Sequence, residues 1–97
     1  MMILHTLATT PGQAAFEDCL AILSPDDAVL LLGNGVYAGI NKTEAFHRLQ
    51  ATGAAVHILR EDALAAGLTG RLDPAAMIDM EEFVALTERY PRQLGWY

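Results

Sequence analysis

One cysteine and three histidines are the only residues in the sequence that readily supply a thiol nucleophile or soft metal ligands. A single thiol excludes an intrachain disulfide and a cysteine-rich zinc site. His5, His47 and His57 fall on separate predicted elements, and no two have the i, i+4 spacing of a helical zinc pair. We therefore expect no metal and no cofactor, and interpret each histidine as bonded to a backbone carbonyl.

Cys19 is the one candidate nucleophile, and it lies on the apolar side of a predicted helix. A nucleophilic cysteine must be reachable and must ionise near neutral pH. The adjacent Glu17 and Asp18 would raise its pKa if they lay near the sulfur, so a cation from elsewhere would be needed. Two interpretations stay open, a reactive thiol and a small buried hydrophobe.

Gly33, Asn34 and Gly35 form the second candidate site, a possible crevice at the end of a strand. They follow five consecutive apolar residues, 28–32, which predict a strand buried on both faces. Open α/β sheets place their ligands at the carboxyl ends of such strands, where glycine N–H groups can face an anion. A tight strand-to-helix turn without a ligand explains the same residues.

The elements that must position these residues alternate along the chain. The patterns predict strands at 2–7, 28–32, 54–59 and 75–79, and a terminal strand or arm at 93–97. They predict a helical turn at 36–40 and a short helix at 60–66. Three further helices are predicted to start after the capping residues Thr10, Thr43 and Asp79. This alternation predicts an α/β fold with a mostly parallel sheet, residues 28–32 at its centre, and helices on both faces.

The composition limits the partners of this chain. We expect a single domain over residues 1–97, without a membrane span or an export leader, in the cytoplasm. A net charge of −6 argues against direct nucleic-acid binding, which needs a basic face.

The apolar content and the C-terminal residues predict contacts with other subunits. At 53% apolar, the chain has more hydrophobic surface than a core of 97 residues holds. Trp96 and Tyr97 indicate a tail docked on the core or on a partner, because free termini are usually polar. Tyr37, beside the glycine turn, is predicted to belong to the same interface.

Taken in order, several segments resemble the DsrH/TusB family of sulfur-relay proteins. The segments are Ile3-Leu-His-Thr-Leu7, Gly33-Asn-Gly-Val-Tyr-Ala38, Arg60-Glu-Asp-Ala-Leu-Ala-Ala-Gly-Leu-Thr-Gly70, and Ile78-Asp-x-x-x-Phe-Val-x-Leu-Thr87 with Pro91 and Trp96 behind it. The resemblance implies a flavodoxin-like (DsrEFH-like) fold. It also implies a cytoplasmic heterohexamer with DsrE/TusD-like and DsrF/TusC-like subunits, two copies of each.

In that family the complex passes persulfide sulfur from an upstream carrier to a downstream one. One branch serves 2-thiolation of the tRNA wobble uridine, and the other serves dissimilatory sulfur oxidation. The main persulfide cysteine belongs to the DsrE/TusD-type subunit, so the resemblance implies an auxiliary role here, with Cys19 as a possible auxiliary persulfide acceptor. A cysteine at this place in the first helix favours the oxidation branch.

Two alternatives to the auxiliary role remain. The chain could be a stand-alone sulfurtransferase that uses Cys19 as its persulfide nucleophile. It could instead be a homodimer that binds a small anion at Gly33, Asn34 and Gly35.

Overall fold

The computed structural model describes residues 2–97 and is built on a five-stranded sheet in the order β4-β3-β2-β1-β5. Every neighbouring pair of strands is parallel, as predicted. The strands are β1 (Ile3–Leu7), β2 (Ala28–Leu31), β3 (Ala55–Leu59), β4 (Met77–Ile78) and β5 (Arg92–Trp96). The segment predicted to be central is therefore the middle strand of the sheet.

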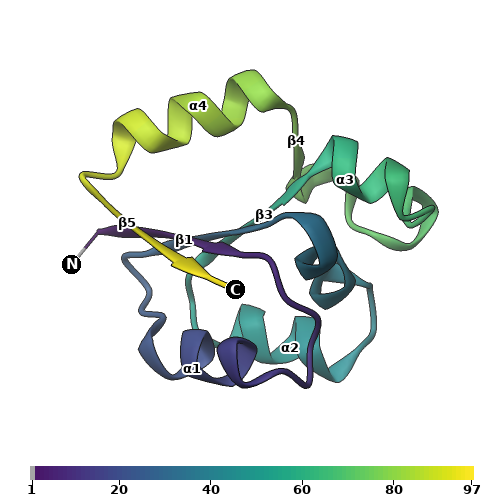
Figure 1. Cartoon of the computed structure of the whole chain (residues 1–97), viewed down its shortest axis with the longest axis horizontal. Coiled ribbons are helices and arrows are strands. Elements are labelled where there is room, and N and C mark those ends of the chain that lie inside the picture. The colour runs from purple at the N-terminus through teal and green to yellow at the C-terminus, as the bar shows by residue number, and fades with distance from the viewer. Residues whose placement is uncertain (1) are drawn as a thin grey trace.

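Helices cover both faces of the sheet, as Figure 1 shows, with α1 and α2 below it and α4 above. The α-helices are α1 (Ala14–Ile22), α2 (Glu44–Ala51), α3 (Arg60–Ala65) and α4 (Met80–Arg89). Three short 3-10 helices join them, namely η1 (Gly33–Gly39), η2 (Thr69–Arg71) and η3 (Pro74–Ala76). Since β4 and β5 are at opposite edges, α4 crosses the whole sheet between them.

The core explains why β2 lacks alternating polar residues. All four of its residues are buried. Val29 and Leu31 join the core cluster on the α1 side, which also holds Phe16 and Cys19. Ala28 and Leu30 join the cluster on the other side of the sheet. That cluster also holds Leu86 of α4 and Tyr90, the residue that follows α4. A strand buried on both faces needs apolar residues at every position.

Three predicted element boundaries were wrong, each for a local reason. The first helix starts at Ala14 and not after Thr10, because Gly12 adopts a φ of +98° that no helix allows. The fourth strand is two residues long instead of spanning 75–79, because Pro74 starts the 3-10 helix η3 there. The helical turn predicted at 36–40 begins earlier, at Gly33.

The cap predictions for the other helices are confirmed. The Thr43 hydroxyl accepts a hydrogen bond from the Phe46 N–H at 3.3 Å. Asp79 and Glu82 form a reciprocal capping box at the start of α4. No helix within residues 2–97 has both the length and the apolarity needed to cross a membrane.

The C-terminal residues form a true strand. β5 runs parallel to β1, with Ile3 in register with Arg92 and Leu7 with Trp96. The Ala8 N–H also donates to the Trp96 carbonyl at 3.0 Å. The first and last strands of the chain are thus neighbours, and the tail is docked on the chain's own sheet.

Candidate functional site

The glycine turn lies where the carboxyl ends of β1 and β2 meet. Gly33 adopts a φ of +53°, in the left-handed region that favours glycine. A Cβ atom on Gly35 would lie 1.9 Å from the Leu7 carbonyl oxygen, so the backbone approach there excludes every other residue. Backbone geometry alone therefore explains why glycine stands at positions 33 and 35, without a bound ligand.

The hydrogen bond that an anion would use at this turn is already made inside the chain. The Gly33 N–H donates to Asp62 Oδ2 of α3 at 2.7 Å. The Gly35 N–H donates to the Leu32 carbonyl at 2.8 Å. A carboxylate of the chain thus occupies the place expected for a ligand, and its charge repels other anions.

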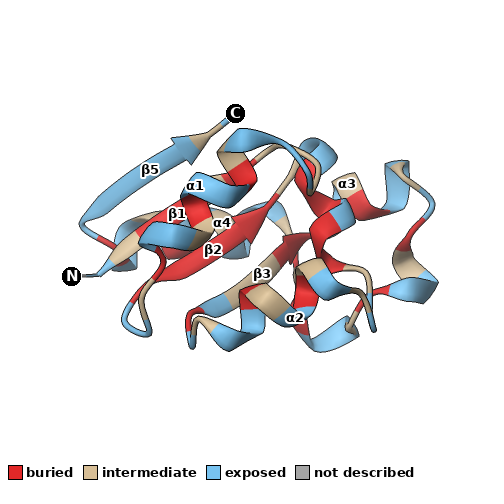
Figure 2. Cartoon of the chain, turned by 90° about the horizontal axis from the view of Figure 1, so that it is seen from below, coloured by how far each residue is buried: buried red, intermediate tan, exposed pale blue. Residues whose placement is uncertain are grey.

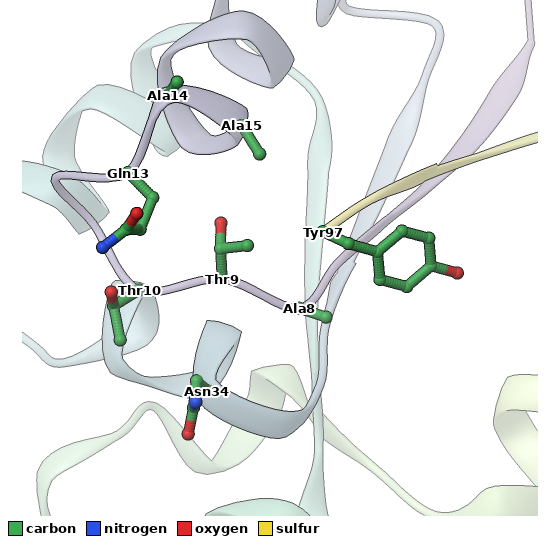
Figure 3. A pocket seen from close by; sticks show the side chains of 8 residues that line it. All are labelled: Ala8, Thr9, Thr10, Gln13, Ala14, Ala15, Asn34 and Tyr97. Carbon is green, nitrogen blue, oxygen red and sulfur yellow. The ribbon is translucent and has the colours of Figure 1, made fainter.

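Two hollows flank Asn34. The larger, about 360 Å³, lies between the end of β1 and the start of α1 and is lined only by uncharged side chains, those of Ala8, Thr9, Thr10, Gln13, Ala14, Ala15, Asn34 and Tyr97. Figure 3 shows that the Tyr97 ring points away from it. The second, about 280 Å³, is lined by Tyr37 and Asp62 among others. Tyr37 and Tyr97 therefore line different hollows.

Cys19 is fully buried in the core cluster on the α1 side of the sheet. Burial, and secondarily the negative charge of Asp27, raise the pKa of its thiol to about 12. Glu17 and Asp18 do not meet the condition under which they would raise this pKa, because both are exposed and Glu17 pairs with Arg48 at 2.7 Å. In this conformation the sulfur is a neutral thiol that no partner reaches.

His5, Asp27 and Trp96 form a polar network that was not predicted from the sequence, with His5 and Asp27 buried. The Trp96 Nε1–H donates to His5 Nδ1 at 3.0 Å. Because Nδ1 accepts, the ring proton sits on His5 Nε2, which donates to Asp27 Oδ2 at 3.1 Å. The His5 and Trp96 rings also stack, with centroids 6.2 Å apart. His5 is therefore satisfied by side chains, not by the backbone carbonyl that we predicted.

Asp27 is the anchor of this network. Its carboxylate also accepts the Ile3 N–H at 2.9 Å and the Ser24 N–H at 3.2 Å. Burial alone would raise the pKa of Asp27, but these bonds and the one from His5 hold it below its usual value. A carboxylate directly before a wholly apolar strand was the sequence signal that could have revealed it, since a buried charge needs partners.

The other two histidines do not form a metal site. His57 is half-buried beside Glu82 and Arg89 in a hollow of about 200 Å³. Burial, followed by the positive charge of Arg89, lowers its pKa. Across residues 2–97, no group of three or more His, Cys, Asp or Glu side chains could hold a metal ion.

The interface residues predicted from the sequence differ in exposure. Trp96 is half-buried through its contacts with His5, whereas Tyr97 is 84% exposed and Tyr37 39% exposed. Other large apolar side chains that lie at the surface are Met2, Ile22, Leu64, Met80, Val84 and Leu94. Their use in an interface stays a prediction.

The chain is similar to proteins of known family. A family profile described as DsrH like protein matches residues 9–93. "Protein TusB" of Pectobacterium parmentieri is 38% identical over 95 residues, which are 97% of this chain and 100% of that protein. "Protein TusB" of Escherichia coli (strain K12) is 37% identical with the same coverage.

A solved structure shares the fold. The solution NMR structure of protein Tm0979 from Thermotoga maritima matches with a TM-score of 0.68 and 23% sequence identity, covering 91% of this chain and 93% of that one.

Proposed function

The chain belongs to the DsrH-like family, and we propose that it is an auxiliary subunit of a sulfur-relay complex that passes persulfide sulfur between carrier proteins. The family match over residues 9–93 carries this proposal. The predicted partners are DsrE/TusD-like and DsrF/TusC-like subunits in a cytoplasmic heterohexamer, together with upstream and downstream sulfur carriers. Residues 1–97 are proposed to act as one DsrH-like domain in that complex.

The surroundings of Cys19 support an auxiliary role. A persulfide acceptor must expose its sulfur to the donor and must reach the thiolate form. Cys19 is fully buried, and its pKa is raised to about 12. An auxiliary persulfide at Cys19 therefore requires that α1 moves away from the sheet in the assembly. The same burial weighs against the alternative of a stand-alone sulfurtransferase.

Occupation of the glycine turn by Asp62 weighs against the other alternative, an anion-binding homodimer. The bond of 2.7 Å from the Gly33 N–H to Asp62 would have to break before an anion could bind. The turn is better explained as the junction that ties the ends of β1 and β2 to α3.

The names of the relatives favour one branch of the family. Both relatives described above are named TusB, and we take this name to indicate the tRNA-thiolation branch of the family. This outweighs the position of Cys19, which had favoured sulfur oxidation, because a buried thiol needs no sulfur chemistry to explain it. We therefore propose tRNA thiolation as the process served.

The proposal is tested by reconstitution. The chain is co-expressed with the DsrE/TusD-like and DsrF/TusC-like chains of its own organism, and the purified complex is loaded with persulfide from a cysteine desulfurase relay. We expect co-purification in equal amounts, and mass spectrometry should find the persulfide on the DsrE/TusD-like cysteine. Omission of this chain should lower loading.

A matched substitution separates the roles of Cys19. With Cys19→Ser in the complex, unchanged loading of the partner supports the auxiliary role without a sulfur on this chain. Partial loss with a persulfide detected on Cys19 supports the auxiliary acceptor. Complete loss would make this chain the catalytic subunit and overturn the proposal, as would failure to co-purify.

A further inference from the structure

The two edges of the sheet are built differently. The β4 edge is only two residues long, Met77–Ile78. The β5 edge, Arg92–Trp96, is five residues long, and four of the five are exposed. Figure 2 shows β5 as an exposed strand at the margin of the molecule, with the buried strands β1, β2 and β3 to one side of it.

The backbone of β5 offers hydrogen-bonding groups to the outside. In a parallel strand, the N–H and C=O of one residue point to the same side, and this side alternates along the strand. The Trp96 carbonyl accepts from Ala8, so Arg92, Leu94 and Trp96 face β1. Gln93 and Gly95 consequently direct their N–H and C=O groups away from the sheet.

This edge lacks the features that usually prevent edge-to-edge pairing. Natural edge strands are kept short, bulged, or interrupted by proline and charged residues. Residues 92–97 contain no proline and no acidic residue, and Arg92 is their one charged residue. Leu94 lies in the middle of the strand with 41% of its surface exposed.

We propose that the β5 edge is an interface between two copies of this chain, which pair antiparallel about Leu94 and join their sheets. The outward groups of Gln93 and Gly95 are placed symmetrically around Leu94. A second copy therefore pairs Gln93 with Gly95 of the first copy, and Gly95 with Gln93, through four backbone hydrogen bonds. No other antiparallel register of two identical strands gives both residues partners inside β5, because a shift by two residues pairs one of them with Pro91 or with Tyr97, which lie outside the strand.

The side chains of this register are compatible with one another. Leu94 meets its own copy at the two-fold axis, which buries its exposed surface. Arg92 lies opposite Trp96 of the other copy, so no two like charges face each other directly. The two Arg92 residues are about 14 Å apart along the strands at about 3.4 Å per residue, which exceeds the Debye length of about 8 Å.

The charge of this segment permits self-association. The whole chain carries a net charge of −6, so two copies repel each other at most orientations. The segment 92–97 is free of acidic residues, so a contact centred on it adds little of this repulsion. A contact centred on one five-residue strand is small, so we expect weak pairing by the isolated chain at micromolar concentration.

Disulfide trapping tests the register directly. Opposed residues in a non-hydrogen-bonded pair have Cβ atoms about 4.5 Å apart, within reach of a disulfide. Under mild oxidation, Leu94→Cys should give a covalent dimer at least tenfold faster than Val84→Cys, a matched control on α4 that is 50% exposed. Gln93→Cys should not cross-link, because its partner is Gly95. The native chain should not cross-link either, because Cys19 is buried.

A second measurement does not depend on cross-linking. Sedimentation should show a concentration-dependent monomer–dimer equilibrium for the native chain, lost in Leu94→Lys and kept in Val84→Lys. Equal trapping rates for Leu94→Cys and Val84→Cys, or a native chain that stays monomeric throughout, would overturn the inference. So would trapping of Leu94→Cys to a different subunit in the reconstituted complex. Assembly with other subunits is read separately by co-purification, so the proposed sulfur relay can stand if this pairing fails.

Discussion

His5 and Cys19 are both fully buried, and Asp27 acts on each of them in the opposite sense. For His5, Asp27 is a hydrogen-bond partner, since the Nε2–H group of His5 donates to Asp27 Oδ2 with 3.1 Å between the two heavy atoms. For Cys19, whose thiol pKa is raised mainly by burial, Asp27 is a nearby negative charge that raises this pKa further. The buried polar groups of this chain therefore hold strands together, while the thiol is kept inert.

The largest effect is expected from removing the carboxylate that both regions share. Asp27→Ala leaves His5 and the N–H groups of Ile3 and Ser24 without their acceptor. Breaking a buried pair in this way should cost about 3 to 5 kcal/mol of the free energy of unfolding, measured by urea denaturation. The neighbouring Asp26 is exposed, so Asp26→Ala is the control and should change stability by less than about 0.5 kcal/mol. Equal losses in the two variants would contradict the role given to Asp27.

The next effect comes from the other end of the network. Trp96→Ala removes the hydrogen bond to His5 Nδ1 and the ring that stacks on it. Because the indole is half-buried, we expect a loss of about 2 to 3 kcal/mol, below that of a fully buried aromatic residue. Tyr97→Ala, at an 84% exposed position, should have little effect. A larger loss of stability in Tyr97→Ala than in Trp96→Ala would show that Tyr97, and not Trp96, holds the C-terminal strand to the core.

These two regions also show what could be predicted from the sequence. The central strand was predicted because five apolar residues in a row, ended by a glycine turn, favour a short strand buried on both faces. The apolar side of the first helix likewise gave burial as one of the two interpretations of Cys19, and the core cluster agrees with that one. Local patterns of this kind depend on residues a few positions apart.

The His5 network was not predictable in the same way. His5 and Asp27 are 22 positions apart, and His5 and Trp96 are 91 apart. The first contact exists because β2 lies beside β1, and the second because β5 returns to the other side of β1. Both are properties of the strand order. The bond from Gly33 to Asp62 joins residues 29 positions apart and was missed for the same reason. In both cases the missing information was topological.

The pH dependence of stability should sharpen the role of Asp27. Its pKa is lowered on folding, so the folded state binds a proton there less readily than the unfolded state. The stabilisation is therefore complete above the unfolded pKa of about 4 and is lost as the pH falls through the lower folded value. Urea midpoints measured between neutral and acid pH should fall more steeply for the native chain than for Asp27→Asn. Parallel profiles would show that other carboxylates dominate the acid transition.

The smallest effect is expected at Cys19, and it decides whether the comparison with His5 holds. The Cys19 thiol takes no part in the hydrogen-bond network of His5. Cys19→Ala should therefore lower the free energy of unfolding by only about 1 kcal/mol, close to the contribution of burying one methylene-sized group. A thiol with a pKa near 12 is almost wholly protonated at neutral pH, so a disulfide reagent should modify native Cys19 only when the chain opens. The modification rate should then follow global stability and rise in Asp27→Ala, although that variant also removes a charge that had raised the thiol pKa. Fast modification of the native chain, unaffected by stabilising salt, would instead reveal an accessible thiolate. In that case α1 would open under native conditions, and Cys19 would be available to accept sulfur.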